Sequence, residues 1–151
     1  MKVVIKTQKL RRLISQLGTV SQGNRVQVGV LSDKTRKGDD KTNAEIGFEH
    51  EFGFWTYKPK LPRRSFLRMP LEKHLPEDLR INWVPMIMAG GMRGALKTLG
   101  VVAEGTIQKA FATGGWGEWP KLSPVTIRRK KSSKILIDTS QLRRSISSRV
   151  V

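Results

Sequence analysis

The chain has 151 residues, of which 38% are apolar, and its formal net charge is +17. This length fits one domain of ordinary size with a single hydrophobic core. The absence of cysteine excludes a disulfide scaffold, an iron–sulfur cluster, a Cys nucleophile and a Cys-based zinc site. The excess of cations implies a polyanionic neighbour or, as the plainer alternative, only a solvated and self-repelling surface.

The positive charge is concentrated at the two ends of the sequence. Residues 1–38 and residues 121–151 each carry nine basic residues and one acidic residue. If both ends lie on one side of the fold, they create a positive field that faces DNA, RNA or an acidic protein surface. The longest apolar stretch, over 81–103, is interrupted by cations and glycines, and the N-terminus has no secretory pattern. We therefore expect no membrane span and a cytosolic site of synthesis.

The first third of the chain predicts one helix, one strand and one loop. Leucine and isoleucine residues at helical spacing indicate a short amphipathic helix over 10–17. Valines alternate with other residues over 26–30, which is typical of a half-buried strand. Residues 32–41 contain no apolar side chain, so this segment is expected to be an exposed and mobile loop.

A second helix is predicted to begin at a capping box, in which Thr42 and Glu45 each satisfy the other's backbone amide. Gly53 is expected to end it in a left-handed conformation. The pattern predicts a core-facing apolar stripe and an opposite polar surface. The stripe consists of Ala44, Phe48 and Phe52, and the surface of Glu45, Glu49 and Glu51.

The middle of the chain predicts an extended segment followed by the longest helix. Two prolines within 58–66 forbid helix there, and Ser65 is expected to cap a short turn that Pro70 ends. The long helix is predicted to begin after Pro85 and to end at Gly114, with apolar residues at helical spacing for over four turns. Its several glycines indicate a bend or the close approach of another backbone.

The last third predicts a short helix, a turn or short strand, and a final mixed element. Ser123 and Pro124 are an N-cap and a first helical residue. Residues 135–137 are expected to form a short buried strand or turn, and Asp138 is expected to cap a helical turn that becomes an edge strand. The sequence as a whole predicts an α+β fold. It is expected to be one small domain over 1–151, with a long central helix packed on a short, mainly antiparallel sheet.

The sequence contains no constellation typical of catalysis. His50 lacks the second histidine of a zinc-protease helix, and no serine stands in a nucleophile elbow near His74. We therefore predict no enzyme activity, no cofactor and no metal. Two groups of residues remain as candidates for partner or DNA contact. The basic candidates are Arg63, Arg64, Arg128, Arg129, Lys130, Lys131, Arg143 and Arg144; the aromatic ones are Trp55, Trp116 and Trp119, which either close over a core edge or anchor a protein partner.

The order of several short motifs resembles the phage virion-morphogenesis family, the lambda Z-like tail-completion proteins. The motifs are the strand over 26–30, Asn43-Ala44-Glu45-Ile46-Gly47-Phe48-Glu49-His50-Glu51-Phe52-Gly53, Pro62-Arg63-Arg64-Ser65-Phe66-Leu67-Arg68, Trp119-Pro120-x-Leu122-Ser123-Pro124, and Leu136-Ile137-Asp138-Thr139-Ser140-Gln141-Leu142-Arg143-Arg144-Ser145-Ile146. The family usually has glycine where Ser140 stands, which puts the tightness of that turn in doubt.

The resemblance implies a structural virion protein of the bacteriophage neck or tail, which completes the tail and joins it to the head connector around the DNA channel. It implies self-association in a ring, with a hexamer favoured, and contacts with the tail terminator and the head connector. Packaged DNA would lie close by. The expected location is the virion, and the host cytoplasm during assembly. The alternative function is a non-specific DNA-binding protein with a basic face.

Overall fold

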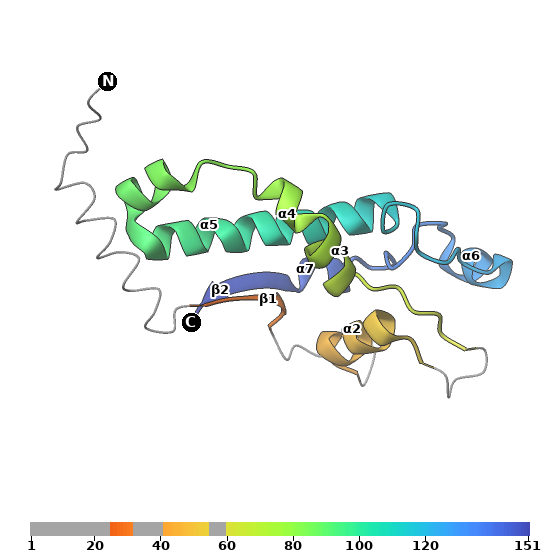
Figure 1. Cartoon of the computed structure of the whole chain (residues 1–151). Helices are drawn as coiled ribbons and strands as arrows, with labels where there is room; N and C mark the ends of the chain where they lie inside the picture. The colour runs from red at the N-terminus through yellow and green to blue at the C-terminus, as the bar shows by residue number, and fades with distance from the viewer. Residues whose placement is uncertain (1–24, 32–40, 55–59) are drawn as a thin grey trace, which may run out of the picture.

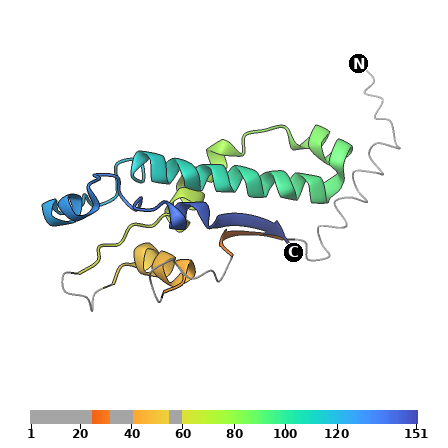
Figure 2. The same cartoon turned by 180° about the vertical axis from the view of Figure 1, so that it is seen from behind.

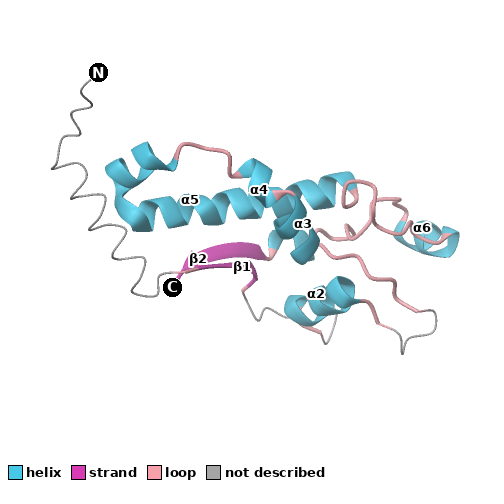
Figure 3. Ribbon diagram, viewed as in Figure 1, coloured by secondary structure: helices cyan, strands magenta, loops and turns pink. Residues whose placement is uncertain are grey.

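The computed structural model describes residues 25–31, 41–54 and 60–151. Within these ranges the chain forms a two-stranded antiparallel sheet and six helices, arranged around one long helix (Figures 1 and 3). In chain order the elements are β1 (Val26–Val30), α2 (Asn43–Phe52), α3 (Arg68–Lys73), α4 (Leu75–Asp78), α5 (Trp83–Thr113), α6 (Pro124–Lys130), α7 (Gln141–Arg144) and β2 (Ile146–Val150). The predicted α+β class, with a long helix packed on a small antiparallel sheet, is confirmed.

The two strands come from opposite ends of the described chain. Val26 pairs with Val150 and Val30 with Ile146, so the apolar side chains of both strands share one face of the sheet. Helix α5 packs on that face, and Figure 2 shows the sheet and helix side by side from behind. The outer face is polar, with Arg149 Nε donating to Gln27 Oε1 at 2.8 Å. The predicted strand over 26–30, and the final helical turn that becomes a strand, are both present.

The long helix α5 begins slightly earlier than predicted and contains a sharp break. Asn82 caps it by accepting from the Val84 amide at 3.2 Å, so Pro85 lies in the first turn, where no intrahelical amide bond is needed. Gly91 has φ 67° and ψ −179°, which places it outside helical conformation and bends the chain. The helix ends at Gly114 in the left-handed conformation, as predicted.

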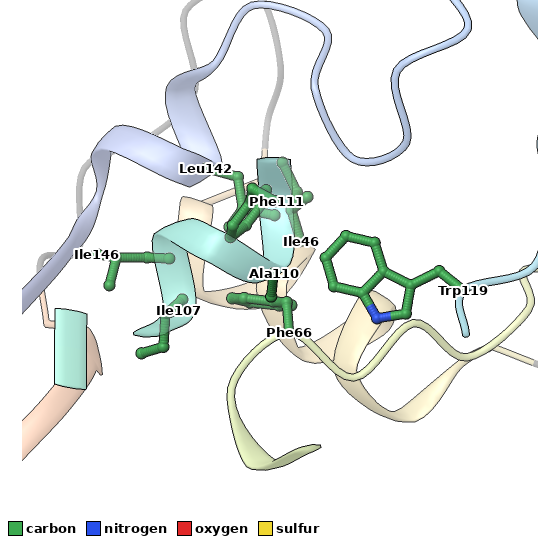
Figure 4. Close-up of a cluster of buried hydrophobic side chains, with 8 residues drawn as sticks. All are labelled: Ile46, Phe66, Ile107, Ala110, Phe111, Trp119, Leu142 and Ile146. Atoms are coloured by element: carbon green, nitrogen blue, oxygen red, sulfur yellow. The ribbon is translucent and has the colours of Figure 1, made fainter. Parts of the chain in front are cut away.

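The core lies where the C-terminal half of α5 meets α2, α3 and the segment that follows α6. Phe66, Ile107 and Ala110 are fully buried there, and Phe111 packs against Phe66 at a ring distance of 5.4 Å. Figure 4 shows how side chains from distant parts of the sequence converge on this point. The buried cluster consists of Ile46, Phe66, Ile107, Ala110, Phe111, Trp119, Leu142 and Ile146.

Helix α2 begins at the predicted capping box, but the face that it turns toward the core is not the predicted one. Thr42 and Glu45 make both reciprocal bonds, at 3.2 and 2.7 Å. The buried residues are nevertheless Asn43, Ile46, Gly47 and Glu51, whereas Phe48 and Phe52 are 60% and 51% exposed. The prediction of an Ala44–Phe48–Phe52 core stripe is therefore wrong.

The reason for the reversed orientation is the close approach of α2 to the core. A Cβ on Gly47 would stand 3.3 Å from Phe66 Cζ and 3.4 Å from Leu142 Cδ1. Only a small residue lets the helix lie this close, so the face with glycine packs inward and the aromatic face remains outside.

Several other expectations concern turns and caps. The turn expected to end at Pro70 is wrong, because α3 continues through Pro70 to Lys73, and proline is tolerated in a first helical turn. Asp138 does not cap α7, whose N-cap is Ser140 in the left-handed conformation, with φ 60°. Residues 135–137 form a half-buried turn rather than a strand. The helix predicted over 10–17 and most of the loop predicted over 32–41 lie outside the described residues.

Candidate functional site

The basic residues at the end of α6 form an exposed cationic group. Ser123 Oγ accepts from the Thr126 amide at 3.2 Å and Pro124 fills the first helical position, so the predicted start of α6 is confirmed. Lys131 ends the helix in the left-handed conformation. Arg128, Arg129 and Lys131 are exposed at this C-terminus, where cations are favoured by the helix dipole, and Lys130 donates to the Lys134 carbonyl at 3.0 Å. We call Arg128 to Lys131 the basic end.

The basic end projects away from the body of the molecule. Both views place α6 beyond the C-terminal end of α5, and no helix or strand of the described chain packs extensively against it (Figures 1 and 2). Within the described residues, no ion pair involves Arg128 or Arg129. These two guanidinium groups are therefore available to an anionic surface.

The other predicted basic residues have different surroundings. Arg64 is only 5% exposed; its Nε donates to the Pro120 carbonyl at 3.0 Å and Nη2 to that of Lys121 at 3.4 Å. Burial lowers the pKa of Arg64 from its usual range. The prediction of Arg64 as a partner-facing or DNA-facing residue is corrected, because its side chain is used to hold the 120–121 loop on the core. Its neighbour Arg63 is exposed.

Arg143 and Arg144 are also engaged within the chain. Arg143 Nε donates to Gln108 Oε1 at 2.6 Å, while Gln108 Nε2 donates to the Arg143 carbonyl at 3.0 Å, which fastens α7 to α5. Arg144 Nη2 donates to the Thr139 carbonyl at 2.7 Å. The structure thus separates the predicted basic set into two groups. One is exposed, on α6 and at Arg63, and the other makes hydrogen bonds within the chain and consists of Arg64, Arg143 and Arg144.

Of the two aromatic candidates that the structure describes, one is buried and one is half-buried. Trp119 is 5% exposed, its Nε1 donates to the Ser65 carbonyl at 3.1 Å, and its ring meets Phe111 edge-on at 5.9 Å. The prediction of Trp119 as an interface aromatic is therefore corrected, and the alternative of a ring that closes the core applies. Trp116 is half-buried and stacks on His74 at 3.6 Å. Trp55 lies outside the described residues.

The exposed aromatic surface lies instead on α2. The rings of Phe48 and Phe52 contact each other at a centroid distance of 4.8 Å. They border a shallow apolar hollow, whose lining also includes Val30, Phe66 and Leu67. Two adjacent exposed phenylalanines next to an apolar hollow are typical of a surface that contacts another molecule. Sequence reasoning missed this surface because it assigned both rings to the core.

Glu51 is a second residue whose role sequence reasoning missed. Its carboxylate is buried and accepts four hydrogen bonds: from the Ser65 hydroxyl at 2.5 Å and from the amides of Phe66, Leu67 and Arg68 at 2.8, 2.9 and 3.1 Å. These amides begin α3, so a side chain from α2 caps another helix. The prediction that Glu51 belongs to a solvated surface is therefore wrong. No local spacing identifies such a cap, because donor and acceptor lie on different elements.

One further carboxylate connects two helices. Asp78 of α4 accepts from Lys109 Nζ and from the Thr106 hydroxyl of α5, each at 2.6 Å. The hydrogen bond from Lys109, with that from Thr106, lowers the pKa of the Asp78 carboxyl below its usual range. Both contacts hold helices together. Among residues 25–31, 41–54 and 60–151, no three metal-ligating side chains gather at one point.

None of the helices in the described part of the chain is both long and apolar enough to cross a bilayer. Comparison with protein-family models, with curated proteins and with solved structures finds no match to this chain.

Proposed function

We propose that this chain is a structural virion protein of the bacteriophage neck or tail, which completes the tail and joins it to the head connector around the DNA channel. It works by packing rather than by chemistry. Its partners are further copies of itself in a ring, with a hexamer favoured, and the tail terminator and head connector. It resides in the virion, and in the host cytoplasm during assembly.

The observation that carries this proposal is the combination of two exposed surfaces on one small body. The core is closed by residues of α2, α5, α7, β2 and the loops at Phe66 and Trp119, yet the phenylalanine pair of α2 and the cations of α6 remain exposed. An exposed pair of large apolar side chains next to an apolar hollow is typical of a surface that contacts another molecule, and assembly subunits carry such surfaces. The order of motifs in the sequence agrees with this role.

A gene deletion in the parent phage tests the proposal. We expect infected cells to accumulate filled heads and separate tails, visible by negative-stain electron microscopy, and purified protein added to the lysate to restore infectious particles. Protein carrying Arg93→Gln, a change at an exposed cation in the first half of α5, is the matched control and should restore them equally. Normal infectious yield from the deletion phage would refute the proposal.

The exposed guanidinium groups of α6 favour one second candidate, a non-specific DNA-binding protein. If this is the function, replacing Arg128, Arg129 and Lys131 with glutamine should weaken binding to every DNA sequence. The slope of log K against log salt should become shallower by about one unit for each phosphate that is no longer neutralised. Arg93→Gln should leave the slope unchanged. An unchanged slope in the triple variant would remove α6 from any DNA-binding role.

A further inference from the structure

We infer that two copies of this chain join head to tail, with α6 of one copy lying on the outer face of α2 in the next. The inference rests on the proposed function for its setting in a ring, and it adds the two surfaces that meet. Both surfaces are described, both are exposed, and each has what the other lacks.

The outer face of α2 combines two aromatic rings with negative charge. On a helix that advances about 100° per residue, Phe48, Phe52, Glu45 and Glu49 fall on one continuous arc. Two of its three glutamates lie on this arc, whereas the third, Glu51, lies outside it and is buried; the helix contains no lysine or arginine. Glu49 Oε1 accepts from Lys41 Nζ at 2.5 Å and the Glu49 side chain is 17% exposed, so an incoming guanidinium group competes with Lys41 for this carboxylate. The face is therefore an acidic and aromatic surface on a basic protein.

The exposed face of α6 has the matching pattern. Val125 is 66% exposed, and Arg128 and Arg129 follow it by three and four residues, which places both guanidinium groups beside its side chain. The helix contains no acidic residue. Val125 with its neighbouring arginines on α6 is therefore complementary to the phenylalanine pair with its neighbouring carboxylates on α2.

The two faces are set apart within one copy. Both views show α6 beyond the end of α5 and α2 below the sheet and helix layers, and the two helices do not pack against each other (Figures 1 and 2). A contact between different surfaces of identical chains is heterologous, so each added copy offers a new free surface, and the assembly closes into a ring or continues as a helix. Phosphate contact by α6 would use the arginines but leave Val125 and the phenylalanine pair exposed, so a second copy explains more of the surface than DNA does.

Disulfide trapping tests the contact directly, because the chain has no cysteine of its own. The probe is the double variant Val125→Cys with Ala44→Cys; Ala44 lines the hollow beside Phe48, so both rings of the phenylalanine pair are kept. Under a copper–phenanthroline oxidant we expect a ladder of dimers, trimers and larger species on non-reducing gels. The control pairs Val125→Cys with Val101→Cys, which is 65% exposed on α5, and should give no ladder above the background of random collision. Equal ladders from both pairs, or none from the first, would overturn the inference.

Charge reversal provides the second arm. Adding Arg128→Glu and Arg129→Glu to the first cysteine pair should lower the trapping rate by about tenfold or more, since like charges would then face each other. Adding Glu49→Lys to that variant should recover a substantial part of the rate; circular dichroism checks that each variant is folded. Loss of DNA affinity in the reversed variant with unchanged trapping would overturn the inference and assign α6 to nucleic acid.

The same variants, without the cysteines, separate this inference from the proposed function. If the charge-reversed protein still restores infectious particles to the deletion phage, the α6–α2 contact is refuted while the tail role stands. If the deletion itself has no effect on infectivity, the tail role is refuted, and the trapping result still decides whether the two surfaces meet. Failure of the reversed variant with recovery by Glu49→Lys supports both.

Discussion

Replacing Glu51 is expected to destabilise this protein more than replacing any exposed carboxylate. Glu51→Ala leaves four donors without their acceptor: the Ser65 hydroxyl and Phe66 amide, which are buried, and the Leu67 and Arg68 amides, which are partly buried. A buried donor left unsatisfied costs about 1–3 kcal/mol, and water can reach the two partly buried amides. We therefore expect a loss of about 3–5 kcal/mol, a large fraction of the roughly 5–15 kcal/mol that stabilises a typical domain.

Glu51→Gln isolates the acceptor chemistry from the volume of the side chain. The amide keeps one oxygen, but its NH₂ group must face at least one backbone amide that cannot accept a hydrogen bond. The Ser65 hydroxyl is the one partner that can accept, and it already accepts from the Met69 amide at 3.0 Å, so we expect a loss of about 2 kcal/mol. Urea unfolding followed by tryptophan fluorescence measures both variants, with the midpoint shifted and the slope unchanged. Glu72→Gln is the control: its side chain is 67% exposed and 4.0 Å from Arg68, so its effect should stay below about 0.5 kcal/mol. A Glu51→Gln variant as stable as this control would refute the capping role.

Three further predictions concern other parts of the fold. Gly100→Ala should destabilise the fold by about 1–3 kcal/mol in urea unfolding, because the new Cβ would collide with the Ser148 side chain, whose own Cβ lies 2.9 Å away. Gly105→Ala has open space around it and should stabilise the fold by up to about 1 kcal/mol. If Gly105→Ala proved the less stable of the two variants, this packing would be contradicted. Ser140 has φ 60°, a left-handed conformation that glycine adopts without strain, so Ser140→Gly should raise the melting temperature and the free energy of unfolding by about 1 kcal/mol. An unchanged melting temperature would mean that the turn is unstrained. Hydrogen bonds from a lysine ammonium and a threonine hydroxyl lower the pKa of Asp78 in the fold below its ordinary value of 3.8. The stability that the Asp78 carboxylate contributes is therefore fully present above this ordinary value and is lost as the pH falls through the lower pKa of the folded state. Asp78→Asn should flatten this acid limb of a stability–pH curve, and an unchanged limb would count against the assignment.

Local patterns predicted the ends of several elements well. The capping box before α2, the serine and proline before α6 and the glycine after α5 depend on hydrogen bonds and backbone conformations within a few residues. Such signals are complete in the sequence, because donor, acceptor and the required φ angle belong to one short segment. The alternation in β1 is local in the same sense.

The candidate site was less accessible to sequence reasoning. The exposed arginines of α6 were identified from a compact basic run, and they are exposed in the structure. Arg64 was grouped with them as a basic residue of the extended, proline-containing segment over 58–66. Its actual partners are the carbonyls of residues 120 and 121, more than fifty positions away in the sequence, and no local pattern announces them.

By itself, the sequence determined that α2 is an amphipathic helix with defined ends, but only the tertiary structure decided which of its faces is internal. Periodicity marks an apolar stripe without saying whether the neighbouring elements can reach it. Here the approach of Phe66 and Leu142 requires the small side of the helix at Gly47, and the amides that begin α3 require the carboxylate of Glu51. Packing at close distance and satisfaction of buried donors are properties of the assembled fold, so they outweigh the hydrophobic pattern of one helix and leave Phe48 and Phe52 outside.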